Sequence, residues 1–121
     1  MNPFNVIQPS ANEIKEADKS KPLPEQIKAL LGAENVVLFM KGNTEFPQCG
    51  FSANTSGILK QLNVPFKTFN ILNDPEIRQG LKEFSQWPTY PQLYVNGELV
   101  GGNDIVTEMY KNGELQALLK S

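Results

Sequence analysis

Residues 36–52 of the chain read VVLFMKGNTEFPQCGFS. The first five residues of this stretch are apolar without alternation, which is typical of a strand that helices cover on both faces. Gly42, Asn43 and Pro47 then indicate a loop. Beyond Cys49, residues that can face a core recur at helical spacing, at Phe51, Thr55, Ile58, Leu59 and Leu62. The stretch therefore predicts a strand, a loop and a helix, with Cys49 where the loop becomes the helix.

The same kinds of pattern extend on both sides of this stretch. Asp74 can cap a helix whose first turn contains Pro75, and Asn96-Gly97 is a strong hairpin signal between two short apolar runs. The further elements predicted are a helix near residues 24–31, a strand over 66–71, a helix from 75 onward, a hairpin of 92–95 with 98–100, and a helical region over 104–119.

This order of elements predicts an α/β fold with a four-stranded mixed sheet flanked by helices. The first two strands bracket a helix and are expected to run parallel, whereas the hairpin adds antiparallel strands. We expect one domain over residues 22–121 and a flexible tail over residues 1–21, where apolar periodicity is weak. A short helix near residues 11–18 is the alternative for part of this tail.

The composition excludes several classes of function. The 121 residues include no histidine and one cysteine, so the chain has no Ser-His or Cys-His pair, no internal disulfide and no Cys-rich zinc site. A formal net charge of -2 argues against nucleic-acid binding. No apolar run approaches the roughly 20 residues that a membrane-spanning helix needs. The single thiol is the most reactive group that remains.

Cys49 is the candidate for that chemistry. A helix start has free backbone N–H groups that stabilise a thiolate, so the pKa of Cys49 is expected to fall, and Lys41 adds positive charge nearby. The alternative is a buried structural cysteine. Gly50 allows a ligand or another backbone to approach closely, and this context favours a functional thiol.

Four separated motifs in the chain resemble the monothiol glutaredoxins of the CGFS type. These motifs are Lys41-Gly42, Pro47-Gln48-Cys49-Gly50-Phe51-Ser52, Trp87-Pro88-Thr89-Tyr90-Pro91-Gln92 and Gly101-Gly102-Asn103-Asp104, within a resemblance over residues 23–119. The resemblance implies a thioredoxin-like fold that binds glutathione and, as a homodimer, a bridging 2Fe-2S cluster. It also implies cluster transfer to iron-sulfur acceptor proteins, BolA-like partners and weak disulfide-reducing activity.

The number of thiols in the chain agrees with a cluster that two chains share. A 2Fe-2S cluster normally takes four thiolates, whereas one chain supplies only Cys49. Two chains and two glutathione thiols complete the set, so cluster binding requires dimerisation. Ser52 stands where a dithiol oxidoreductase would carry its second thiol, so reduction of a mixed disulfide at Cys49 would need free glutathione.

Glutathione carries two carboxylates and one ammonium, and its site needs matching charges. The resemblance indicates Lys41 as the cation for the glycine carboxylate, with an ordinary surface lysine as the alternative, and it indicates Arg78, together with Lys82, as a glutathione contact. Arg78 and Lys82 lie four residues apart on one helix face, alongside an apolar stripe of Ile77, Leu81 and Phe84. An ordinary solvated helix face is the alternative.

Two further segments complete the predicted glutathione site. The resemblance implies a cis bond between Tyr90 and Pro91, which lets the backbone of Tyr90 pair with the ligand like an added strand. Asn103 is expected to contribute its backbone and Asp104 to hold the γ-glutamyl ammonium, although either residue can instead be a plain helix N-cap.

Two aromatic residues of these motifs have alternative roles. For Trp87 we favour a core or rim aromatic that supports the following turn. Phe51 either shields the cluster from water or is the first core residue of its helix.

The function predicted from the sequence is a glutathione-ligated 2Fe-2S carrier. A glutathione-dependent thiol-disulfide oxidoreductase with Cys49 as nucleophile is the alternative, and an adaptor that uses the same groove without a cluster is a third hypothesis. The free thiol indicates a reducing compartment. The acidic, arginine-free N-terminus favours the cytoplasm over the mitochondrial matrix or plastid stroma.

Overall fold

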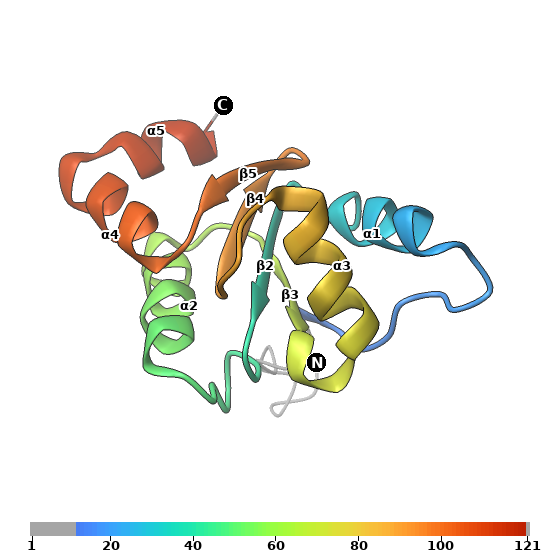
Figure 1. Ribbon diagram of the computed structural model, residues 1–121. Helices are drawn as coiled ribbons and strands as arrows, with labels where there is room; N and C mark the ends of the chain where they lie inside the picture. Colours follow the sequence, from blue (N-terminus) through green and yellow to red (C-terminus); the bar gives the residue numbers. More distant parts are fainter. Residues whose placement is uncertain (1–11, 121) are drawn as a thin grey trace, which may run out of the picture.

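A mixed β-sheet between two layers of helices makes up the computed structural model, which describes residues 12–120 (Figure 1). In chain order the elements are β1 (Glu13–Ile14), α1 (Leu23–Leu31), β2 (Val36–Met40), α2 (Gly50–Leu62), β3 (Lys67–Asn70), a 3-10 turn η2 (Ile71–Asn73), α3 (Pro75–Ser85), β4 (Gln92–Val95), β5 (Glu98–Gly101), α4 (Asn103–Asn112) and α5 (Glu114–Lys120). The strands lie in the order β1-β3-β2-β4-β5.

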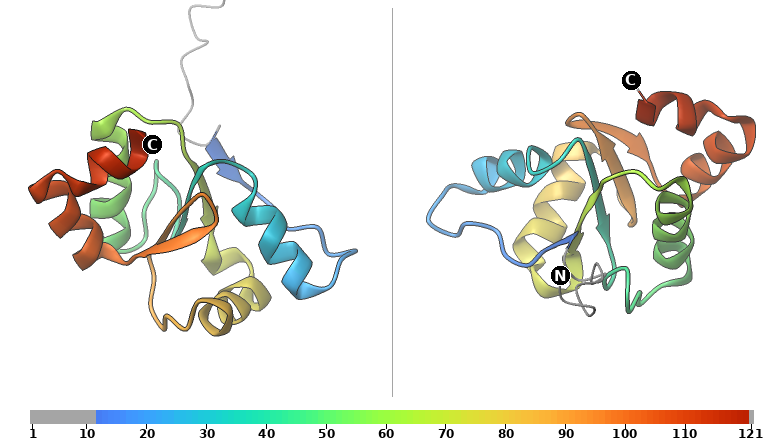
Figure 2. Two further views of the ribbon diagram at one scale, coloured as in Figure 1. Left: turned by 90° about the horizontal axis from the view of Figure 1, so that it is seen from above. Right: turned by 180° about the vertical axis from the view of Figure 1, so that it is seen from behind.

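Strand β2 lies at the centre of the sheet and supplies side chains to both cores. All five of its residues are buried, as the unbroken apolar run predicts. Val37 and Phe39 belong to the core that α1 and α3 cover, whereas Leu38 and Met40 belong to the core under α2, α4 and α5. These helices lie on opposite sides of the sheet (Figures 1 and 2).

The predicted strand directions are confirmed. Strands β2 and β3 are parallel and are joined through α2, whereas β4 pairs antiparallel with both β2 and β5. Asn96 and Gly97 form the hairpin turn with φ of 53° and 82°, the left-handed values that a two-residue turn of this kind requires.

The prediction of four strands is wrong by one strand. Glu13 and Ile14 pair in parallel with Thr68 and Phe69 of β3, which makes β1 a fifth strand at the sheet edge. Ala17, which follows β1, is buried in the core with α1 and α3. Part of the segment predicted as a tail therefore packs on the domain as a strand and a loop, without the alternative short helix, and residues 1–11 lie outside the described residues.

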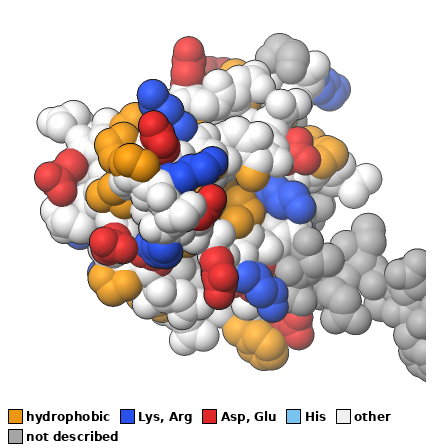
Figure 3. Space-filling model, turned by 90° about the vertical axis from the view of Figure 1, so that its right-hand side faces the viewer, with side chains coloured by type: hydrophobic (Ala, Val, Ile, Leu, Met, Phe, Trp, Pro, Cys, Tyr) orange, Lys and Arg blue, Asp and Glu red, His pale blue; other side chains and the backbone are white. Residues whose placement is uncertain are grey.

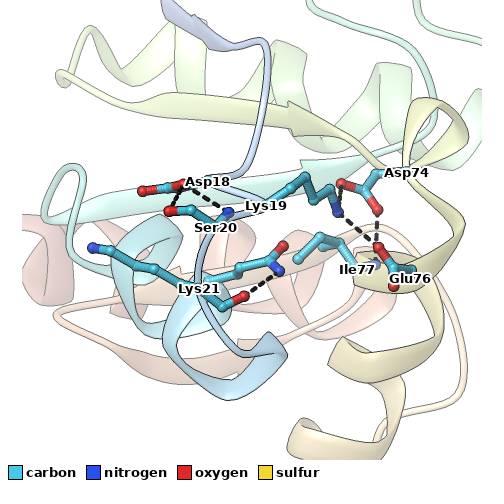
Figure 4. Close-up of polar contacts among 8 residues, drawn as sticks. Asp18, Lys19, Ser20, Lys21, Asp74, Glu76 and Ile77 are labelled. Atoms are coloured by element: carbon cyan, nitrogen blue, oxygen red, sulfur yellow. Dashed lines mark hydrogen bonds and ion pairs between the residues drawn. The ribbon is translucent and has the colours of Figure 1, made fainter.

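Ion pairs also connect this N-terminal segment to α3 (Figure 4). Lys19 Nζ lies 2.7 Å from Asp74 Oδ2 and 3.2 Å from Glu76 Oε1. Asp74 is the predicted N-cap of α3, and its Oδ1 accepts a hydrogen bond of 3.1 Å from the backbone N–H of Ile77. One carboxylate thus caps the helix and binds Lys19.

The predicted apolar stripe of α3 is buried only in part. Ile77 and Leu81 are fully buried, but Phe84 is 50% exposed. Phe84 lies in the last turn of α3. Helical spacing identifies the face of a helix that is buried, but it does not show where along the helix the burial by neighbouring elements ends.

The charged side chains form no single-sign surface on the side of the molecule that carries α1, where basic and acidic groups are interspersed (Figure 3). Within residues 12–120, none of the helices has the length and apolar character that crossing a membrane requires.

We expect Asp74→Ala to destabilise the fold by about 1 kcal/mol, because it removes the cap of α3. Lys19→Ala should cost less, about 0.5 kcal/mol or below, since the Lys19 side chain is about half exposed and water screens its charge. Asp74→Asn is the matched control, because asparagine keeps the cap and removes the charge. Urea unfolding curves measure all three changes, and equal losses for Asp74→Ala and Asp74→Asn would contradict the role of the cap.

Candidate functional site

The loop between β2 and α2 brings Cys49 back beside the end of β2. Gly42 makes this possible with φ of 89°. A Cβ at this position would lie 2.4 Å from Phe46 O and 2.7 Å from Gln48 N, both backbone atoms. The backbone N–H of Gln48 donates to Lys41 O over 2.8 Å, which closes the loop. Only glycine fits this turn, and the turn places the thiol near Lys41.

Cys49 is the N-cap residue of α2 and is half-buried. Hydrogen bonding from the backbone N–H of Ser52 lowers the pKa of the Cys49 thiol, and the N–H of Phe51 and the charge of Lys41 act in the same direction. Burial opposes these effects but does not cancel them. The structure thus agrees with the expected low pKa and presents a thiol that is accessible and readily ionised.

Ser52 is fully buried in the first turn of α2. Its Oγ accepts a hydrogen bond of 3.1 Å from the backbone N–H of Lys41, and its hydroxyl also helps to lower the pKa of Cys49. The hydroxyl therefore links the end of β2 to α2. It cannot serve as a resolving group, because a serine does not form a disulfide.

A groove of about 570 Å³ opens beside Cys49. We call it the Cys49 groove and define it by its lining residues. All seven residues that the sequence analysis assigned to the site line it, namely Lys41, Cys49, Arg78, Lys82, Tyr90, Asn103 and Asp104. The other lining residues are Phe51, Trp87, Pro88, Thr89, Pro91, Gly102 and Ile105. Segments that are far apart in the sequence thus meet in one groove.

Helix α3 brings Arg78 and Lys82 to the groove. The hydroxyl of Tyr90, whose pKa is raised by burial, donates a hydrogen bond of 2.6 Å to the backbone oxygen of Arg78. This bond connects α3 to the loop before β4. Together with Lys41, the two side chains give the groove three cations.

Residues 87–91 form another wall of the groove, and the Tyr90–Pro91 peptide bond is cis, as the resemblance implied. Gln92, which is fully buried, holds this loop, because its Nε2 donates to Trp87 O over 3.0 Å and to Thr89 O over 3.2 Å. The sequence analysis assigned Gln92 no role. Its place directly after the Tyr90-Pro91 pair was the only signal.

The side chain of Trp87 forms part of the groove wall, in addition to its expected role beside the turn that follows it. Trp87 is half-buried and lines the groove, and within residues 12–120 its buried Nε1 has no hydrogen-bond partner. A Cβ on Gly102 would lie 3.3 Å from this Nε1 and 3.3 Å from Pro91 O. Gly102 therefore lets the start of α4 approach Trp87 closely.

The alternative that Asn103 or Asp104 is a plain helix N-cap is wrong. Gly102 is the N-cap, and Asn103 and Asp104 are the first two residues of α4. Asn103 Oδ1 instead accepts hydrogen bonds from Asn54 Nδ2 and Thr55 Oγ1 of α2. Asp104 is exposed at the groove.

Phe51 and Ile105 form an apolar rim on the groove, with 62% and 38% of their surface exposed. The alternative of Phe51 as a core residue is therefore wrong. It lies in the first turn of α2 and lines the groove, whereas the next residue, Ser52, is buried.

The groove combines a low-pKa thiol, three cations and one carboxylate. This set matches a ligand with more anionic than cationic groups and a sulfur that can meet Cys49. No cluster of three His, Cys, Asp or Glu side chains that could hold a metal ion occurs in the described part of the chain. A metal bound at Cys49 would need further ligands from outside this chain.

Comparisons with known proteins bear on this arrangement. The family model described as Glutaredoxin matches residues 36–100. The chain is similar to an uncharacterized monothiol glutaredoxin ycf64-like of Synechocystis, with 57% identity over 95 residues that cover 78% of this chain and 89% of the relative. It is similar to the chloroplastic monothiol glutaredoxin-S14 of Arabidopsis thaliana, with 56% identity over 78% of this chain, and it spans 54% of that relative's length.

A solved structure confirms the fold. The solution structure of reduced poplar apo GrxS14 superposes with a TM-score of 0.73 and 53% sequence identity, covering 81% of this chain and 90% of the poplar chain. The predicted thioredoxin-like fold is therefore correct, with five strands in place of four.

We expect Cys49 to be alkylated by iodoacetamide at a lower pH than the same residue in the urea-unfolded chain, because a lowered pKa keeps the thiolate present at lower pH. Lys41→Gln should move the midpoint of the pH–rate profile upward, since one of the stabilising charges is lost. Lys60→Gln removes a charge at the far end of α2 and is the control. A profile unaffected by Lys41→Gln would show that Lys41 does not act on the thiol.

Proposed function

We propose, from the premise that this chain belongs to the monothiol glutaredoxin family, that it binds glutathione in the Cys49 groove and carries a 2Fe-2S cluster as a homodimer. The cluster is cargo that the protein passes to iron-sulfur acceptor proteins. BolA-like proteins are the further partners that we propose.

The observation that carries this proposal is the meeting of one low-pKa thiol with opposite charges in a single groove. Lys41, Arg78 and Lys82 suit a carboxylate end, and Asp104 suits an ammonium. Glutathione has two carboxylates, one ammonium and a central thiol. Its charge pattern and its sulfur therefore match the groove.

The number of thiols then requires a second chain. Each chain contributes Cys49, and each bound glutathione contributes one thiol, so two chains with two glutathione molecules supply the four thiolates of a 2Fe-2S cluster. The cluster, when bound, supplies the iron and sulfide that an acceptor protein receives. Phe51 and Ile105 are exposed beside the thiol and would limit the access of water to the shared sulfur atoms.

A glutathione-dependent thiol oxidoreductase remains the second candidate function, and the lowered pKa of Cys49 favours it. The Cys49 thiolate would attack the glutathione sulfur of a mixed disulfide, form a Cys49–glutathione disulfide and release the substrate thiolate, which takes a proton from water. A free glutathione thiolate would then attack that disulfide, release oxidised glutathione and restore Cys49. Ser52 cannot replace glutathione in this second step, because it has no thiol.

The free thiol also suggests where the protein works. A chain that depends on a reduced cysteine and on glutathione suits a reducing compartment. We propose the cytoplasm, with the mitochondrial matrix and the plastid stroma as the alternatives.

The wild-type chain, purified without oxygen in the presence of glutathione, should be brown and should elute at the size of a dimer. Cys49→Ser removes the only protein thiol but keeps the shape of the side chain, so it should be colourless and monomeric. Visible absorption spectroscopy with size-exclusion chromatography measures both properties. A cluster held by a monomer, or held without glutathione, would overturn the proposal, and vigorous reductase turnover of a colourless wild type would favour the second function.

The double variant Arg78→Glu/Lys82→Glu should weaken glutathione binding roughly tenfold or more, because the ligand carboxylates lose charge-assisted partners and meet repulsion. At limiting glutathione its cluster should be lost faster than that of the wild type. Lys28→Glu/Lys60→Glu makes the same charge change at exposed positions on α1 and α2 and serves as the control. Equal cluster lifetimes in both double variants would argue against the assignment of α3 to the ligand.

A further inference from the structure

Asn70 lies where the loop of residues 41–49, here called the Cys49 loop, leaves the sheet. It is the last residue of β3 and pairs with Met40, the last residue of β2, in the parallel ladder between the two strands. Asn70 is half-buried, and the described residues that line the Cys49 groove do not include it. Any effect of Asn70 on a ligand in this groove is therefore exerted through other residues.

One oxygen atom of Asn70 binds two separate segments of the chain. Its Oδ1 accepts a hydrogen bond of 3.0 Å from the backbone N–H of Gly42 and another of 3.0 Å from the backbone N–H of Leu72. Gly42 belongs to the Cys49 loop, whereas Leu72 lies in η2, the turn that leads into α3. Asn70 therefore connects the loop that carries Lys41 to the helix that carries the other two cations of the groove.

Hydrogen bonds to three different segments hold the backbone of Lys41 and Gly42. The N–H of Lys41 donates to Ser52 Oγ in α2 over 3.1 Å. The oxygen of Lys41 accepts from the N–H of Gln48 within the loop over 2.8 Å. The third bond is the one from Gly42 to Asn70 Oδ1. Gly42 is buried, so removal of the Asn70 oxygen would leave its N–H without a partner and would release this end of the loop.

We propose that Asn70 is a positioning residue for ligand binding, because its Oδ1 holds Lys41 in a fixed relation to Arg78 and Lys82, so that cations from two segments bind one anionic ligand together. This inference rests on the proposed function, because it takes glutathione as the ligand. It assigns a part in binding to a side chain that the ligand does not touch.

The physical basis of this positioning is order that exists before the ligand binds. A ligand that must bring cations on two independent segments into place spends part of its binding free energy on that ordering. The side chain of Lys41 is long and flexible, so the position of its backbone, which Asn70 holds through Gly42, decides where its charge can reach. The contribution of Lys41 to binding should therefore depend on Asn70.

A double-mutant cycle between Asn70 and Lys41 measures this dependence. Asn70→Ala, Lys41→Gln and the combination of the two are titrated with reduced glutathione, and the fluorescence of Trp87, the only tryptophan, reports binding. Asn70→Asp keeps an oxygen for both N–H groups and is the conservative variant. Asn73→Ala makes the same substitution at an exposed position in η2 and is the control.

In the wild-type background we expect Asn70→Ala to weaken glutathione binding between about threefold and tenfold, because Lys41 loses its fixed position. In the Lys41→Gln background the same substitution should change the affinity less than about twofold, since the charge that Asn70 positions is already absent. At about 0.15 M salt, which screens a charge outside the groove, Asn70→Asp should keep the wild-type affinity within about twofold. Asn73→Ala should leave the affinity unchanged in both backgrounds.

The outcomes separate this inference from the proposed function. Equal losses for Asn70→Ala in both backgrounds, as a general weakening of the fold would cause, or no loss in either, would overturn the inference and leave the proposed function standing. A loss with Asn70→Asp as large as with Asn70→Ala would also overturn it, because the oxygen would then not be the group that matters. If thermal unfolding shows that Asn70→Ala is not folded, the milder Asn70→Ser takes its place in the cycle with the same criteria. A wild-type chain that does not bind glutathione would overturn both proposals.

Discussion

The Cys49 groove depends on a buried chain of hydrogen bonds from the sheet to the loop before β4. The Tyr94 hydroxyl donates to Gln92 Oε1 over 3.0 Å, and Gln92 Nε2 donates to the backbone oxygens of Trp87 and Thr89. Both side chains are at most 1% exposed, so loss of one partner would leave a polar group buried without compensation. These bonds therefore tie the loop that lines the groove to the strand from which the two side chains extend.

Local patterns in the sequence predict most of the fold because each one reports a local physical requirement. The unbroken apolar run of β2 reflects burial on both faces, Asn96-Gly97 reflects a turn that needs left-handed backbone, and Asp74 before Pro75 reflects a helix start. The seven assigned site residues meet in one groove because their motifs lie at the ends of the elements that surround it.

The features that the sequence did not predict depend on contacts between distant segments. Strand β1 has two residues, too few for an alternating pattern, and it exists only through its pairing with β3. Phe51 and Phe84 have helical spacing, but both are exposed in the first and last turns of their helices, where the neighbouring elements do not cover them. The role of Asn103 depends on donors about fifty positions away, which no local pattern reveals.

Strand β1 has a consequence for colloidal behaviour. Without it, the outer backbone groups of Thr68 and Phe69 in β3 would be open, and an open strand edge is a template on which identical chains can stack into aggregates. A protein that we propose to dock repeatedly with partners spends time at close range to other copies. By occupying that edge with Glu13 and Ile14, the chain protects itself from fibrillar self-association there, while the thiol in the loop after the central strand stays accessible.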